Sequence, residues 1–272
     1  MRSDAVQIIV ELARSIGREH QAGSGTLCLT LVGVFFLAAM PAAHAFSLTP
    51  ITMEFEPSGR GANQAYQVEN PADQPVAVQI SMLSREVDLD GQERNAPAED
   101  DFIVYPAQVL LKPKQVQTVR VKWVGTAKPE KELTYRILAE ELPIDLTKEQ
   151  PSGSAVSGHI KVVVRYLGSV YIVPKGARAN VMLDSTASEI GEDGTRKLVL
   201  VFHNRGTAHV LLSGLKLTFQ AGGKTVNLGP DDLKGVAGAN LLAGNKRRFV
   251  VPWPTELPEG PVQSSFDFDG RR

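Results

Sequence analysis

The stretch "FIVYPAQVLLKPKQVQTVRVKWVG", residues 102–125, decides the fold class of this chain. Its last part alternates between two sets of side chains, Val116, Thr118, Arg120 and Lys122 in one and Gln117, Val119, Val121 and Trp123 in the other. Because successive side chains of a strand point to opposite faces, this alternation predicts a strand with one solvent-facing side and one buried side. The whole stretch predicts three short strands.

The same two-residue period continues on both sides of this stretch, and long helical patterns are absent. Residues 65–83, "AYQVENPADQPVAVQISML", predict two strands around an Asn-Pro turn. Asp90 and Gly91 form a hairpin signal, and residues 133–143, "LTYRILAEELP", predict a further strand.

A loop and a hinge divide the remaining strands. The Pro, Ser and Gly content of residues 144–158 predicts a flexible loop. After it, "HIKVVVRYLGSVYIVP" (159–174) predicts a long apolar strand that carries a cation, Arg165, and the following "KGARA" indicates a hinge. Beyond the hinge, residues 197–219 predict strand, turn and strand, and "RRFVVPWP" (247–254) and "SSFDF" (264–268) predict later strands.

We therefore expect an all-β protein with two immunoglobulin-like β-sandwiches of about a hundred residues each. The predicted limits are 46–173 for the N-terminal domain and 174–272 for the C-terminal domain. Barrels are the alternative architecture that the strand pattern leaves open.

The N-terminus predicts a secretory signal peptide over residues 1–45. An apolar run in "TLCLTLVGVFFLAAMPAAHA" (26–45) is followed by small residues, with Ala43 and Ala45 at the two positions of an A-x-A cleavage site. Cleavage after Ala45 would leave a mature chain that begins "FSLTPITMEF". The alternative is a membrane anchor, but the apolar run falls short of the roughly 20 residues that span a bilayer.

Composition argues against several function classes. The net charge is −1 and no block of basic residues occurs, which argues against a nucleic-acid partner. Cys28, in the leader, is the only cysteine, so the mature chain is expected to lack disulfides and thiol chemistry. Its three histidines, His159, His203 and His209, are too few and too irregularly spaced to predict a metal site. With no catalytic motif either, we expect neither an enzyme nor a cofactor, and no small-molecule substrate.

Taken in order, the motifs resemble the periplasmic chaperones of the chaperone–usher pilus pathway, the PapD-like proteins. The segments that carry the resemblance are "FSLTPITMEFEPSG" (46–59), "VENPADQPVAVQI" (68–80), "FIVYPAQVLLKPKQVQTVRV" (102–121), "TYRILAEELP" (134–143), "VVVRYLGSVYIVP" (162–174) and "LVLVFHNRGTAHVLLSGLKL" (198–217). They cover most of the predicted mature chain.

This resemblance implies two immunoglobulin-like domains arranged as a boomerang, a location in the periplasm, and two kinds of partner, pilin-like subunits and an outer-membrane usher. It also implies donor-strand complementation, in which the chaperone lends a strand to a subunit that lacks one. The long apolar strand is the natural donor, because such an edge strand is otherwise an aggregation hazard. The residues expected to enter the subunit's groove are Val156, Ile160, Val162 and Val164. Self-association through this strand is a further possibility in the absence of a client.

Members of the family anchor the subunit's terminal carboxylate with two basic residues, one on the first strand and one on the donor strand. This sequence departs from that pattern, because Thr52 stands near the expected place on the first strand. The resemblance leaves Arg165 on the donor strand and Arg136 on its expected neighbour as the candidate anchor pair. The rival hypotheses are a secreted two-domain adhesion or scaffold module that lends no strand and, less favoured, a metal-dependent sandwich enzyme.

Overall fold

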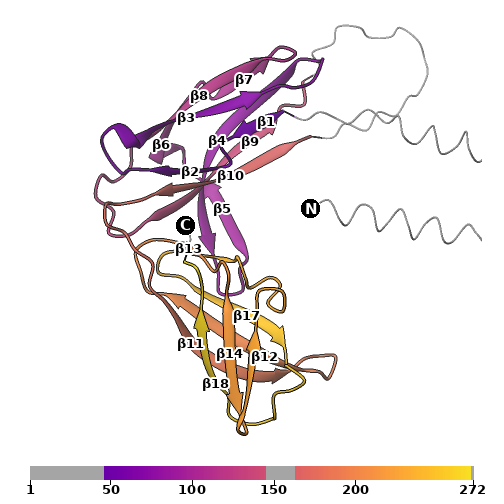
Figure 1. The fold of residues 1–272 in the computed structure, drawn as a ribbon. Coiled ribbons are helices and arrows are strands. Elements are labelled where there is room, and N and C mark those ends of the chain that lie inside the picture. The colour runs from indigo at the N-terminus through magenta and orange to yellow at the C-terminus, as the bar shows by residue number, and fades with distance from the viewer. Residues whose placement is uncertain (1–45, 145–162, 271–272) are drawn as a thin grey trace, which may run out of the picture. The chain divides into compact units, whose positions relative to one another are not determined.

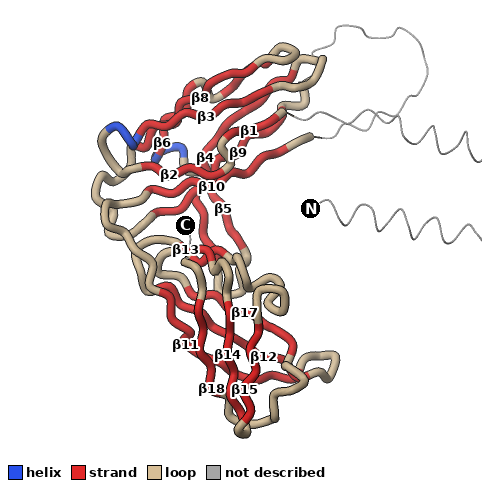
Figure 2. Tube along the Cα trace, viewed as in Figure 1, coloured by secondary structure: helices blue, strands red, loops and turns tan. Residues whose placement is uncertain are grey.

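The computed structural model describes residues 46–144 and 163–270, and this part of the chain is built from strands (Figures 1 and 2). Its only helical elements are two short 3-10 turns, η1 (Arg60–Ala62) and η2 (Glu99–Asp101). Neither approaches the length of a membrane-crossing helix. The all-β fold class predicted from the two-residue period is confirmed.

The N-terminal half forms two sheets that face each other. The first has the order β1-β3-β8-β6 and consists of β1 (Ser47–Thr49), β3 (Asn63–Glu69), β8 (Val116–Trp123) and β6 (Phe102–Tyr105). The second has the order β2-β10-β9-β4-β5, with β7 also paired to β4. Its strands are β2 (Thr52–Phe55), β10 (Arg165–Ile172), β9 (Leu133–Glu141), β4 (Val76–Val87), β5 (Glu93–Pro97) and β7 (Gln108–Leu111).

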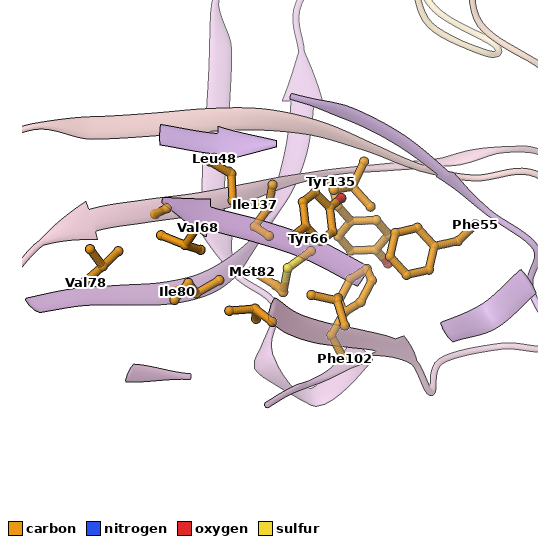
Figure 3. Packing of buried hydrophobic residues seen from close by; sticks show 14 of the residues in the cluster. Leu48, Phe55, Tyr66, Val68, Val78, Ile80, Met82, Phe102, Tyr135 and Ile137 are labelled. Carbon is orange, nitrogen blue, oxygen red and sulfur yellow. The ribbon is translucent and has the colours of Figure 1, made fainter. Parts of the chain in front are cut away.

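Alternate residues of both sheets fill one hydrophobic core, part of which is drawn in Figure 3. In β8 the set Val119, Val121 and Trp123 is buried, as the alternation predicted. Phe102 packs edge-on against Tyr135 and Trp123, with ring centroids 4.9 and 5.1 Å apart. Each large apolar side chain removed from water in this way contributes about 1.5–3 kcal/mol.

A second core lies in the C-terminal half of the chain and includes Phe202, Phe219 and Phe249. Three sheets surround it. They are β11-β12-β17 (Val181–Ile190, Arg196–Asn204, Lys246–Pro252), β13-β16 (Val210–Leu211, Asn240–Leu241) and β15-β14-β18 (Lys224–Leu228, Lys216–Ala221, Gln263–Asp267). The two separate cores agree with two sandwiches, and the boundary at Pro174 remains a prediction.

The structure differs from the strand predictions in two places. Residues 208–219 were expected to form one strand, but they form β13 and β14, which belong to different sheets. The break comes at Gly214, where φ is 62° and the Asp269 carboxylate packs against the Cα. The sequence analysis also missed β11, because this strand is largely exposed and rich in Ser and Thr, and so lacks a clear alternation.

The hairpin predicted from Asp90 and Gly91 is confirmed, and its turn also makes contacts with the C-terminal half. Gly91, with φ 87°, lies in the turn that joins β4 to β5, and a Cβ atom there would overlap the guanidinium of Arg247. Beside it, the Asp90 carboxylate pairs with Arg248 at 2.6 Å, and the Leu89 carbonyl accepts a hydrogen bond from the Arg248 N–H. The hairpin tip thus contacts β17 of the C-terminal half.

Candidate functional site

The first half of β10 has a strand neighbour on only one side. β9 pairs antiparallel with all of β10, from Arg165 to Ile172. On the other side, the parallel strand β2 pairs only with Ser169–Ile172. Within the described residues, no strand pairs with Arg165–Gly168 on that side. The pairing with β2 begins directly after Gly168. A Cβ atom at this position would lie 2.9 Å from the carbonyl oxygen of Ile51, which is too close for any residue other than glycine.

Hydrogen bonds on the two sides of β10 show which backbone groups face the open side. The N–H of Ser169 donates to the carbonyl of Ile51, on the side of β2. The carbonyl of Val164 accepts from Glu141, on the side of β9. Because backbone groups of a strand alternate in direction, the N–H and C=O of Arg165 and Leu167 point toward the open side. These are the groups that an added strand would use.

The side chains on the two faces of β10 differ. Val170 and Ile172 belong to the N-terminal core, and Val164 and Tyr166 pack against it. On the opposite face, Leu167 is 41% exposed. The first half of β10 is therefore anchored to its own core by one face and remains accessible along its edge and its outer face.

Arg165 and Arg136 both lie on the outer face of the sheet, but their side chains have different partners. Arg165 is directly opposite Glu140 in the register, and its Nε lies 2.6 Å from the Glu140 carboxylate. Arg136 lies opposite Ser169, and its Nη1 donates to the Ser169 hydroxyl at 2.6 Å. The Arg165 side chain is 68% exposed, whereas that of Arg136 is 15% exposed.

Arg136 is held by an internal carboxylate. Its Nε and Nη2 donate to the two oxygens of Glu93 at 2.7 and 2.6 Å, in the bidentate geometry that suits a guanidinium. Arg85 donates to the same carboxylate from Nε at 2.9 Å. Thr52 lies next to this cluster, because it pairs with Ser169 in the register of β2 and β10. The cluster carries two guanidinium groups for one carboxylate.

The two arginines control the ionisation of Glu93. Partial burial favours the neutral acid, but the hydrogen bond from Arg136 and the charges of Arg85 and Arg136 outweigh it and lower the pKa of the Glu93 carboxyl from 4.5 to about 2. The pKa of Glu93 is lower in the folded state than in the unfolded chain. The ionised Glu93 carboxylate and its two arginines therefore stabilise the fold fully above pH 4.5, and this contribution is lost as the pH falls toward 2.

Glu93→Gln is therefore expected to lower stability at neutral pH and to flatten the loss of stability between about pH 4.5 and 2. Urea unfolding midpoints measured across this pH range would check the expectation. Glu140→Gln is the control, since it changes the same chemistry opposite the exposed Arg165. A Glu93→Gln variant with the wild-type pH profile would show that the cluster does not stabilise the fold.

Several predicted site residues lie outside the described part of the chain. Of the proposed donor residues, Val156, Ile160 and Val162 fall there, as does the predicted signal peptide, and Val164 is the one that the structure places. Glu93, Arg85 and Ser169, which the structure places beside Arg136, were not predicted from the sequence. The signal available for Ser169 was its position near the end of the apolar strand, but nothing local in the sequence indicated that Glu93 would reach Arg136.

The histidines that flank the turn at 204–206 do not meet. His203 Nδ1 lies 3.3 Å from Asp184, and His209 Nδ1 bonds both oxygens of Glu132 at 2.8 and 2.9 Å. In residues 46–144 and 163–270, no group of three or more His, Cys, Asp or Glu side chains is placed to hold a metal ion.

Residues 48–177 match the family described as pili and flagellar-assembly chaperone, PapD N-terminal domain. Residues 48–177 therefore belong to the PapD N-terminal domain family. The match begins at β1 and ends just past β10, so the half-open strand and the arginine cluster both lie within this PapD domain.

Two solved structures share the fold over most of this chain. One comes from the CsuC–CsuE chaperone–tip adhesion subunit pre-assembly complex of archaic chaperone–usher Csu pili of Acinetobacter baumannii. It is 16% identical, with a TM-score of 0.54, and the match covers 82% of this chain and 97% of that chain. The other is the class 5 fimbriae chaperone CfaA, 12% identical with a TM-score of 0.50, covering 82% and 98%. No curated protein sequence matches the chain significantly.

Proposed function

We propose that this protein is a periplasmic chaperone that binds pilin-like subunits by lending them a strand and delivers them to an outer-membrane usher. The observation that carries the proposal is the half-open strand β10, whose Arg165–Gly168 segment has a strand on one side only among the described residues. An incomplete sandwich could pair with this edge and bury apolar side chains of the donor segment against its own core. Membership of the PapD domain family supports the same role.

We further propose which residues form the donor strand and where the two domains begin and end. The donor side chains are Val156, Ile160, Val162 and Val164, in a first domain that spans 46–173 and is followed by a second domain over 174–272. Of these four, only Val164 lies in the described residues, where its side chain packs against the N-terminal core. The role is that of a binding protein without catalysis, and the leader 1–45 would direct it to the periplasm.

For the client's terminal carboxylate we propose Arg136 and Arg165 as the anchor. Arg165 is exposed and can turn toward a client from its pair with Glu140. Arg136 already holds the Glu93 carboxylate in a bidentate bond, so a client carboxylate would have to share or replace it. Until a client arrives, Glu93 would hold the guanidinium of Arg136 in a fixed orientation.

Co-expression with a pilin-like subunit from the same source is expected to yield a one-to-one complex. Val162→Glu is expected to abolish it, because a carboxylate would enter an apolar groove. Arg165→Ala and Arg136→Ala are expected to remove the preference for a client with a free C-terminal carboxylate over its amidated form. Size-exclusion chromatography and binding titrations measure these effects.

The control for these variants is Lys122→Ala, on the outer face of the other sheet. If Val162→Glu and Arg165→Ala both bind the client with wild-type affinity, the strand-lending assignment is wrong. A protein that binds a partner but never lends a strand would then fit the rival adhesion or scaffold module.

A further inference from the structure

Tyr171 of β10 is buried, but it faces away from the N-terminal core. Its neighbours Val170 and Ile172 belong to that core, whereas Tyr171 does not and is nevertheless only 2% exposed. Its ring stacks on the imidazole of His209, with centroids 3.8 Å apart and planes 10° from parallel. His209 directly precedes β13 in the C-terminal half. Residues from the C-terminal half thus help to bury this face of β10.

The Tyr171 hydroxyl also joins the two halves. It accepts a hydrogen bond from Asn240 Nδ2 of β16 at 2.7 Å, and another from Arg85 Nη1 of β4 at 3.3 Å. Arg85 is in turn bonded to Glu93, the carboxylate that holds Arg136. A continuous set of polar contacts therefore leads from the arginine cluster, through Tyr171, to the C-terminal half.

His209, on which the Tyr171 ring stacks, is fixed by a buried partner. Both oxygens of Glu132, in the loop before β9, bond His209 Nδ1, and one also accepts from the His209 N–H at 3.2 Å. The Glu132 N–H donates to the carbonyl of Thr207 at 2.9 Å. The Glu132 side chain is fully buried and that of His209 is 4% exposed, so neither group can turn to water in place of the other.

We propose that Tyr171 is a positioning residue that couples client pairing on β10 to the placement of the C-terminal sandwich. Tyr171 and Leu167 lie on the same face of one strand, four residues apart, and the ladder with β9 holds that strand along its whole length. A client strand paired at Arg165–Gly168 acts on β10 directly, and Tyr171 transmits its displacement to His209 and Asn240. The coupling rests on the proposed function, whereas the positioning role does not.

The test of the positioning role uses no client. Cys28 is the only cysteine, so Cys28→Ser combined with Lys122→Cys and Lys216→Cys gives two exposed spin-label sites, one in each half. Tyr171→Phe, which removes only the hydroxyl, is expected to broaden the distance distribution between the labels. Tyr105→Phe is the control, because Tyr105 is 74% exposed on β6. A Tyr171→Phe distribution equal to that of the wild type, with the same thermal unfolding midpoint, overturns the proposal.

The coupling is tested by titrating each variant with the client subunit. Tyr171→Phe, which loses both hydrogen bonds of the hydroxyl, is expected to bind about fivefold more weakly, and Tyr105→Phe is expected to bind as the wild type does. A broadened distribution with unchanged affinity overturns the coupling. If the wild-type protein binds no pilin-like subunit, the proposed function fails, but the distance measurement still decides the positioning role.

Discussion

Leu167→Pro is expected to abolish client binding while leaving the protein folded. The N–H of Leu167 points toward the open side of β10, where a client strand would pair, and takes no part in the ladder with β9. Proline removes that donor and is tolerated on the edge of a sheet where the N–H faces outward. A client carbonyl left unpaired in the interface costs about 1–3 kcal/mol, roughly 5- to 150-fold in affinity, and the proline ring adds a steric clash.

The measurement is a binding titration with the client, accompanied by the far-UV circular dichroism and thermal unfolding of the free variant. Leu167→Val is the matched control, because it trims the same exposed side chain and keeps the N–H. Gly168→Pro is the opposite control, since it removes an N–H that faces β9 and should unfold the sheet. If the Leu167→Pro variant is folded and binds the client with wild-type affinity, the strand-lending function is contradicted.

His209→Leu is expected to destabilise the protein by about 3–5 kcal/mol. The substitution leaves the Glu132 carboxylate, which is fully buried, without the ring nitrogen that bonds both of its oxygens. The carboxylate keeps its desolvation cost and retains, of its contacts with residue 209, only the hydrogen bond from the backbone N–H. Leucine fills a similar volume, so the loss reflects the polar contact more than a cavity. Urea unfolding followed by tryptophan fluorescence would measure the change.

The matched control is the double variant Glu132→Leu with His209→Leu, which removes both members of the pair. Because an apolar pair can replace a buried polar pair with little loss, the double variant should recover most of the stability that His209→Leu loses. If the double variant is no more stable than the single one, the cost comes from packing against Tyr171, and the carboxylate is not responsible.

Local alternation was enough to predict most strands of the N-terminal half. In β8, every second residue from Val119 onward is buried, as the pattern required. The limits of β14 were not predicted, although Gly214, with its positive φ, marks the turn that separates β14 from β13. β11 was missed because its mostly exposed positions put no constraint on hydrophobicity.

The candidate site, like the fold, could be predicted from the sequence only in part. Arg165 stood out because a cation in an apolar strand is unusual, and the structure places it on the exposed outer face. Its pairing with Glu140 and the capture of Arg136 by Glu93 depend on the order of β10, β9, β4 and β5 in the sheet. That order comes from long-range pairing, which no local pattern records. The family resemblance did predict that the strands of Arg165 and Arg136 are neighbours, and β10 pairs with β9. The carboxylates that these arginines meet could not be predicted from single strands.

The parallel pairing of β2 with β10 has a consequence for the order of assembly. Thr52 meets Ser169, so the two strands join the beginning and the end of the N-terminal sandwich in a contact of very high sequence separation. Such contacts form slowly, because a long chain must be closed before any hydrogen bond is gained. On the proposed export route, the chain could not complete its N-terminal sandwich until residue 172 had crossed the membrane. The last strand to join that sandwich would then be the one that the proposed function shares with a client.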